Sequence, residues 1–110
     1  DDLIALKNAN AIARSIRNLV FTVPGDKPFN PFLGCRVSEM LFDPMDKITT
    51  SAIRSEIEET VNNYEPRVNL KKVQVQENPD GNEYNVIINY TIIGIEADAQ
   101  QLSFALELTR

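Results

Sequence analysis

The hydrophobic pattern of this chain changes its period at Pro66, and this change limits the possible folds more than any other feature. Before the proline, apolar residues recur at helical spacing, as in Ile53, Ile57 and Val61. After it, apolar and polar residues alternate, which is typical of strands. Proline cannot donate a backbone hydrogen bond and disfavours helical geometry at the preceding residue, so the helix must stop near Tyr64. We therefore expect helices followed by strands.

The last third of the chain predicts three sequential strands. Val73 and Val75 lie in the first, and the residues at 78–82, Asn-Pro-Asp-Gly-Asn, form a turn by composition. Residues 84–92 and 102–108 alternate as the second and third strands. Short connections favour an antiparallel meander with one apolar face for the helices to cover. The predicted class is α+β, with about three helices packed on one face of a three-stranded antiparallel meander sheet.

One local conflict lies at the start of the first strand. Val68 and Leu70 have the opposite parity to Val73, so a regular strand cannot place all of them on one face. Either the strand begins after Lys72, or a β-bulge lies near Lys71. The sequence leaves both alternatives open.

The first half of the chain predicts shorter helical segments. Asn8 is a suitable N-cap for a helix that runs to about Val20, and residues 1–7 are expected as an extended lead-in. Residues 37–42 suit one or two helical turns. We expect the whole chain, residues 1–110, to form one domain. The first helix buries one face, made of Ile12, Ile16, Leu19 and Val20.

The long helix before Pro66 has its own start signal. Thr49 is the expected N-cap, and Ile48 and Ile53 have the spacing of a hydrophobic staple around it. The face opposite the apolar stripe is acidic and polar. It carries Glu56, Glu58, Glu59 and Asn62.

Residues 21–35 predict an ordered loop. Proline and glycine recur along the segment, so we expect no long helix or strand there. It nevertheless contains Phe21, Phe29 and Phe32, whereas flexible linkers are polar. We expect this loop to pack against its own core or against a neighbouring protein.

Composition argues against several classes of function. The net charge of −5 argues against nucleic-acid binding, and no apolar run is long enough to cross a bilayer. The chain has no histidine, which excludes His-based triads and His-ligated zinc sites. Its single cysteine, Cys35, is expected as a small buried packing residue. We expect no cofactor and no metal.

The acidic residues offer the only candidates for acid–base catalysis, and their arrangement argues against it. A glycosidase needs two carboxyl groups that face each other across a cleft. Glu56 and Glu59 are neighbours on one helix face, and a charge run on a helix is usually solvated. The turn at 78–82 lacks the length and the closing Glu of a calcium loop. We expect no catalytic residues.

Glu65-Pro66-Arg67 is the most distinctive polar group. Proline fixes the backbone between the two charges, and arginine can make a planar, bidentate contact with a carboxylate or with carbonyl groups. The motif could bind a partner, or it could simply end the helix and pair within the chain. A third strand at the sheet edge could likewise accept a strand from another protein, or it could be a protected edge.

Several segments together resemble a known family. Asn63-Tyr64-Glu65-Pro66-Arg67-Val68, which follows an acidic amphipathic helix, resembles the "EPR" signature of the contractile-tail baseplate wedge family, which includes sheath-initiator subunits of T4-like phages and their type VI secretion counterparts. The resemblance covers nearly all of the chain from about Ile12. The other matching segments, in the family's order, are Ser15-Ile16-Arg17-Asn18, Thr22, Gly25, Pro28-Phe29-Asn30-Pro31, Gly34-Cys35 and Leu41-Phe42.

The resemblance implies a structural role in the assembly of a larger complex and no enzymatic activity. Members occupy the baseplate wedge of the virion tail, in six copies, and contact other wedge proteins and the sheath protein. It implies that strands near residues 73–77 and 101–110 face the sheath and initiate its assembly. It also implies that the "EPR" motif docks on the wedge core. The predicted partner-binding residues are Tyr64, Glu65, Pro66, Arg67, Phe29 and Pro31.

Two other functions remain as alternatives. Members of the family are often labelled lysozymes, so a peptidoglycan-degrading enzyme of the baseplate is the first. A regulatory module that sequesters one bacterial partner is the second, because a bacterial anti-adaptor shares the domain. Neither nucleic acid nor a membrane is an expected partner.

Overall fold

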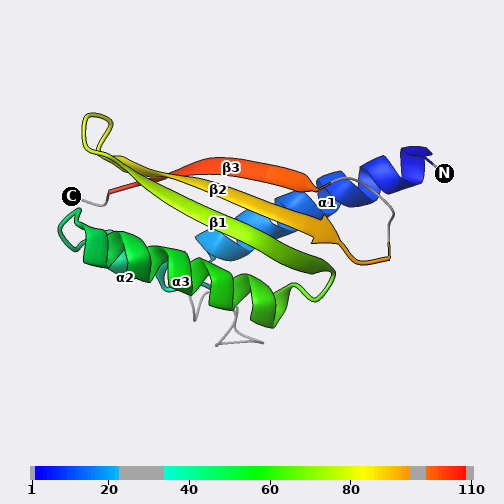
Figure 1. The fold of residues 1–110 in the computed structure, drawn as a ribbon, viewed down its shortest axis with the longest axis horizontal. Coiled ribbons are helices and arrows are strands. Elements are labelled where there is room, and N and C mark those ends of the chain that lie inside the picture. Colours follow the sequence, from blue (N-terminus) through cyan, green and yellow to red (C-terminus); the bar gives the residue numbers. More distant parts are fainter. Residues whose placement is uncertain (1, 23–33, 95–98, 109–110) are drawn as a thin grey trace.

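The computed structural model describes residues 2–22, 34–94 and 99–108, with side chains described from Ala9 onward. Three helices precede three strands, as the change of period at Pro66 predicted (Figure 1). The elements are α1 (Asp2–Phe21), α2 (Val37–Met40), α3 (Lys47–Tyr64), β1 (Val68–Asn78), β2 (Glu83–Ile92) and β3 (Gln100–Glu107).

The strands form an antiparallel sheet in the order β1-β2-β3, which confirms the predicted meander. Val73 pairs with Ile88, and Val86 pairs with Phe104, so apolar residues of all three strands share one face. The register of β1 shifts between Leu70 and Lys72. The β-bulge near Lys71 is therefore the correct alternative, and it places the two parts of the strand on the same apolar face.

A single core joins this face to the helices. Figure 1 shows α1 crossing behind the sheet and α3 running beside β1, and α3 contacts both β1 and α1. The predicted stripe of α1 is buried, and Ile53, Ile57 and Val61 of α3 are completely buried. The residues of β2 that complete the core are Tyr84, Val86, Ile88, Tyr90 and Ile92.

The predicted lead-in at residues 1–7 is wrong, because α1 already begins at Asp2. Leucine, alanine and lysine between Asp2 and Asn8 are strong helix formers, and they extend the helix through the expected cap. Asn8 is thus an interior helical residue. Weak apolar periodicity at the start of the chain did not prevent a helix.

The predicted start of the long helix is also wrong. Asp46 is the N-cap of α3, and its Oδ1 accepts a hydrogen bond from the backbone N–H of Thr49 at 2.8 Å. Thr49 is buried inside the first turn, and Ile48 is 82% exposed, so no hydrophobic staple forms there. Aspartate and threonine are both good caps, and the burial of Thr49 is consistent with the earlier start.

Cys35 is buried as predicted, and burial raises the pKa of its thiol above the ordinary value of 9.0. Its backbone N–H donates to the carbonyl of Thr22 at 2.8 Å, which brings together the two ends of the predicted loop. Residues 23–33, including Phe29 and Pro31, lie outside the described residues.

Two isoleucines of α3 provide a matched test of this core. Ile57→Ala should lower the free energy of unfolding by about 2–5 kcal/mol, because it removes a completely buried side chain. Ile48→Ala removes the same atoms from an exposed site and should change it by less than about 0.5 kcal/mol. Urea unfolding of both variants measures the difference. Equal losses would contradict the described position of α3.

Candidate protein-docking site

The helix-to-sheet corner is built by the end of α3 and the start of β1. Glu65 is the C-cap of α3, with non-helical φ −126° and ψ 80°, and its N–H still donates to the carbonyl of Val61 at 2.9 Å. Pro66 follows, exposed and without an N–H to satisfy. The chain therefore turns within two residues, and Arg67 stands directly before β1.

The carboxylate of Glu65 is buried at the corner and is bound by two other side chains. Only 4% of Glu65 is exposed. Arg67 donates from Nε to Oε1 at 2.6 Å and from Nη2 to Oε2 at 3.0 Å, which is a bidentate ion pair. Ser15 of α1 donates from Oγ to Oε2 at 2.8 Å. The corner thus connects α1, α3 and β1 through one buried carboxylate.

These hydrogen bonds set the protonation of the corner. The hydrogen bonds from Arg67 hold the pKa of the Glu65 carboxyl below its ordinary value of 4.5, Ser15 acts in the same direction, and burial opposes both. The same pair raises the pKa of Arg67. Glu65 is therefore ionised at neutral pH and serves as a fixed anchor for the guanidinium.

Arg67 remains accessible although it is paired. Its side chain is 52% exposed, so the guanidinium is held from below by Glu65 while its outer part faces solvent. Tyr64 is half-buried beside it. Tyr64 also lines a hollow of about 430 Å³ together with residues of α1, which include Arg14 and Ser15. The corner therefore offers a rigid charged group next to a recess.

The structure brings together four of the six predicted partner-binding residues: Tyr64, Glu65, Pro66 and Arg67. Phe29 and Pro31 lie outside the described residues. Ser15 was not predicted as part of the site, although it is the only helix α1 side chain with a described hydrogen bond to Glu65. Fifty residues separate them. Two signals were available: Ser15 is next to the buried stripe residue Ile16, and it begins the segment Ser15-Ile16-Arg17-Asn18 that resembles the family.

Two glutamates of the acidic face of α3 make contacts within the chain. Glu56 Oε1 accepts the backbone N–H of Arg36 at 3.0 Å, which fixes the segment before α2. Glu58 lies 3.8 Å from Arg54 one turn earlier, and both side chains are about half exposed.

In the described part of the chain, no group of three or more Cys, Asp, Glu or His is placed to hold a metal ion. None of the described helices has the length and apolar character needed to span a membrane.

Both outer strands of the sheet have an unpaired side. Among the described residues, β1 and β3 each pair only with β2 (Figure 1). An unpaired strand edge presents backbone donors and acceptors that another strand can use. The fold and the corner together describe a small α+β protein with surfaces suited to contacts with other proteins.

Comparison with known proteins agrees with that class. The family described as "Baseplate wedge protein gp25" matches residues 7–97. The baseplate wedge protein gp25 of Enterobacteria phage T4 is 33% identical over 98 residues, which cover 87% of this chain and 73% of that protein. The chain therefore belongs to the baseplate wedge protein gp25 family.

Solved structures show the same fold. A candidate tail lysozyme from Geobacter sulfurreducens superposes with a TM-score of 0.85 at 23% identity and covers 94% of this chain and 93% of its own. A chain of the baseplate complex of the type VI secretion system superposes with a TM-score of 0.74 at 14% identity, covering 94% and 96%. At these identities the likeness concerns the fold alone.

Because Glu65 is buried and ionised, we expect the free energy of unfolding to depend on the protonation of this carboxyl group. Glu65→Gln should lower the free energy of unfolding at pH 7 by about 1–3 kcal/mol, because a buried charge-assisted network is lost. The pKa of the Glu65 carboxyl is lower in the folded protein than its ordinary value of 4.5. The stabilisation is therefore fully present above pH 4.5, and it is lost as the pH falls through the pKa of Glu65 in the folded protein. Urea unfolding at pH 7 and at pH 3 measures both effects.

Glu58→Gln is the matched control, because its pair with Arg54 is half exposed and should contribute at most about 1 kcal/mol. A Glu65→Gln variant whose stability equals that of the wild type at pH 7 would show that the corner carboxylate does not support the fold.

Proposed function

We propose that this chain is a non-enzymatic structural subunit of a contractile-tail baseplate wedge, located in a phage tail, that docks on other wedge proteins and initiates the sheath. Membership of the gp25 family supports the baseplate location. The observation that carries the docking role is the half-exposed Arg67 held by the buried Glu65. A binding group that is already ordered loses little conformational entropy when a partner arrives.

Arg67 is proposed as the central docking group. Its Nε and Nη2 bind Glu65, which leaves further N–H groups of the exposed guanidinium for a partner. Carboxylates and the carbonyl groups at a helix end are suitable acceptors. The hollow beside Tyr64 can receive a side chain of the same partner. Phe29 and Pro31 are proposed, on sequence grounds, as additional contacts.

The sheet is proposed as the template for the sheath. The unpaired side of β3 can accept an extended segment of the sheath protein, because main-chain hydrogen bonds extend a sheet without needing a particular sequence. Several copies around the tail, six as the resemblance implies, would present such edges in a ring. Many modest contacts in one ring give strong assembly through effective concentration.

The peptidoglycan-degrading alternative has less support from the geometry. A general acid for glycoside cleavage needs a carboxyl group with a raised pKa. Glu65 is a buried carboxylate, but Arg67 and Ser15 lower its pKa and occupy its oxygens. The likeness to a candidate tail lysozyme is at 23% identity, which speaks for the fold and not for catalysis.

Arg67→Ala tests the docking role directly. The variant leaves the buried Glu65 carboxylate with only its described hydrogen bond from Ser15, so it should be less stable than the wild type, and thermal unfolding identifies the temperature range in which it is folded. In that range it should enter baseplates at least about tenfold less well than the wild type, since it lacks the exposed guanidinium. Arg36→Ala is the matched control, because the Arg36 side chain is exposed and its described hydrogen bond comes from its backbone. Quantitative recovery in purified baseplates measures both. Normal incorporation of Arg67→Ala would contradict the proposal.

Purified protein incubated with isolated peptidoglycan tests the alternative. We expect no release of soluble fragments and no difference between the wild type and Glu65→Gln. Turbidity and reducing-end assays, with a known muramidase as positive control, measure the outcome. Fragment release that Glu65→Gln abolishes would establish an enzyme and overturn the non-enzymatic role.

A further inference from the structure

Two large apolar side chains are exposed in the connection between α2 and α3. Phe42 is 64% exposed and Ile48 is 82% exposed. Met45, midway between them in the sequence, is partly buried and packs against the core. Apolar side chains gain free energy when a partner removes them from water. Because most of the surface of Phe42 and Ile48 faces solvent, the partner must supply the recess that encloses them.

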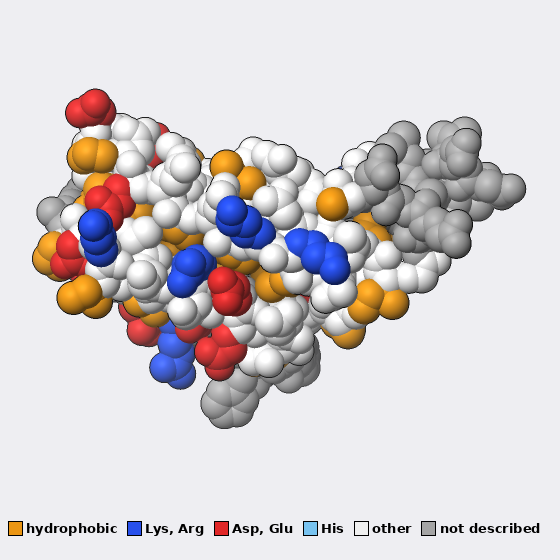
Figure 2. All heavy atoms as spheres, in the orientation of Figure 1, with side chains coloured by type: hydrophobic (Ala, Val, Ile, Leu, Met, Phe, Trp, Pro, Cys, Tyr) orange, Lys and Arg blue, Asp and Glu red, His pale blue; other side chains and the backbone are white. Residues whose placement is uncertain are grey.

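The β1–β2 turn lies at the same end of the molecule as this connection (Figure 1). The backbone N–H of Leu108, just after β3, donates to the carbonyl of Asn82 in the turn at 3.0 Å, so β3 also ends here. Figure 2 shows both hydrophobic and acidic side chains at this end, on the left. We call this surface the acidic end and define it as residues 42–48, residues 77–83 and Glu107.

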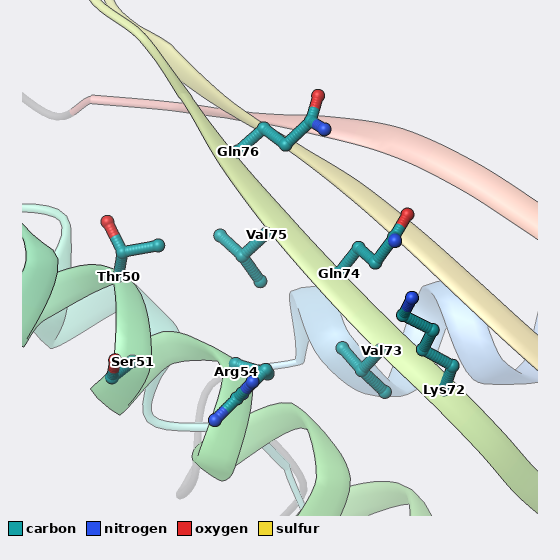
Figure 3. Close-up of a pocket in the computed structure, with 8 residues that line it drawn as sticks. All are labelled: Thr50, Ser51, Arg54, Lys72, Val73, Gln74, Val75 and Gln76. Atoms are coloured by element: carbon teal, nitrogen blue, oxygen red, sulfur yellow. The ribbon is translucent and has the colours of Figure 1, made fainter.

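The acidic end is fixed to the rest of the fold. Asp46 caps α3, and Thr50 in the first turns of that helix donates from Oγ1 to Oε1 of Glu77 at 2.8 Å. Figure 3 shows Thr50 on the side of α3 that faces β1, where both elements line a hollow of about 300 Å³. The connection is therefore held against the end of β1. Phe42 and Ile48 are carried on an ordered surface, so little conformational entropy is lost when they are bound.

The net charge of the chain is concentrated at this end. The acidic end has one basic residue, Lys47, and six acidic residues, which are Asp43, Asp46, Glu77, Asp80, Glu83 and Glu107. The rest of the chain contains ten acidic and ten basic residues, so the net charge of −5 comes entirely from the acidic end. A partner that approaches here meets a local excess of negative charge.

Three of these carboxylates have no partner of opposite charge in the described part of the chain. Asp80, Glu83 and Glu107 form no ion pair there. Glu83 and Glu107 are moreover directly opposite each other on β2 and β3, and like charges in such a cross-strand pair are destabilising. A basic group of a partner would remove this repulsion, so charge complementarity selects a basic surface.

We propose that the acidic end binds a partner protein through an apolar recess, rimmed by lysine or arginine side chains, that encloses Phe42 and Ile48. The inference rests on the proposed role in a baseplate wedge and adds a second contact to it. Arg67 stands before the first residue of β1 and Glu77 near its last, so about 30 Å of strand separates the two contacts. A second copy of this chain, a nucleic acid or an anionic membrane would be repelled by the same charge.

Site-specific photo-cross-linking in assembled baseplates tests the proposal. Phe42 and Ile48 are replaced, one at a time, by p-benzoylphenylalanine, and cross-linked peptides from irradiated baseplates are identified by mass spectrometry. We expect both positions to cross-link to one partner protein. The same replacement of Asn85, exposed on the open face of the sheet, is the control and should not reach that segment of the partner. The absence of cross-links from both positions, cross-links only to another copy of this chain, or the same cross-link from Asn85 overturns the proposal.

Charge variants test the basic rim of the recess. In the chain with the photo-reactive residue at position 48, Asp80→Lys with Glu83→Lys should lower the cross-linking yield at least about tenfold. Glu58→Lys with Glu59→Lys makes the same charge change on α3, outside the acidic end, and should leave the yield nearly unchanged. Thermal unfolding shows that both variants fold. Equal yields from the two variants overturn the proposal, because position within the acidic end would then have no effect.

An apolar variant tests the recess itself. Phe42→Ser, in the chain with the photo-reactive residue at position 48, should lower the yield at least about tenfold, because one of the two enclosed side chains is lost. Ile93→Ser removes an apolar side chain that is also exposed, at 62%, and lies beyond the other end of the sheet, so it should leave the yield unchanged. An unchanged yield with Phe42→Ser overturns the shared recess.

All yields are measured per chain incorporated, which separates this inference from the proposed function. If the wild-type chain does not enter baseplates, the proposed function fails and this inference fails with it. If the wild type enters, Arg67→Ala enters poorly and neither Phe42 nor Ile48 cross-links to a partner, the docking at Arg67 stands and only the contact at the acidic end is overturned.

Discussion

The bidentate pair between Arg67 and Glu65 is the interaction on which the rest of the structure depends. It ties the end of α3 to the start of β1, and Ser15 extends the same network to α1. The carbonyl of Arg67 also accepts the backbone N–H of Ile93 at 2.8 Å, just beyond the end of β2. A buried carboxylate must be paired to be tolerated, so the corner holds three elements in one relative orientation. The same constraint keeps the guanidinium directed outward.

The surfaces on either side of this corner differ in what they offer. The helices cover the apolar face of the sheet, and its other face is open, with side chains such as Gln74, Asn85, Ile87 and Ser103. Among the described residues, the two outer strands keep unpaired sides, and α3 lies beside one of them. A rigid charged corner and two strand edges on one small domain suit a protein that must touch several neighbours at once. Such a protein needs a fixed shape more than it needs a deep cavity.

Periodicity was sufficient to predict the buried stripes of α1 and α3, the antiparallel order of the strands and the two alternatives at Lys71. These features depend on local spacing, which the sequence shows directly. The start of α1 and the cap of α3 were predicted wrongly. Several residues could begin each helix. Strong helix formers extend α1 to Asp2, and in α3 the burial of Thr49 and the exposure of Ile48 are consistent with the earlier start.

The corner was singled out from Glu65, Pro66 and Arg67 in the sequence, but the burial of Glu65 and the exposure of Arg67 were not predicted. Ser15 of α1, which binds the Glu65 carboxylate, is fifty residues away in the sequence and reaches it only in the folded arrangement of α1 and α3. Contacts between distant segments therefore account for what the sequence left undetermined.

The environment of Arg67 in an assembled baseplate tests the central claim most directly. A high-resolution reconstruction of the baseplate with this chain in place would show the guanidinium and its neighbours. The account predicts that Arg67 keeps both hydrogen bonds to Glu65 while its exposed side becomes buried against acceptor groups of a wedge protein. An Arg67 that still faces solvent in the assembled baseplate, or that leaves Glu65 to bind its partner, would contradict it.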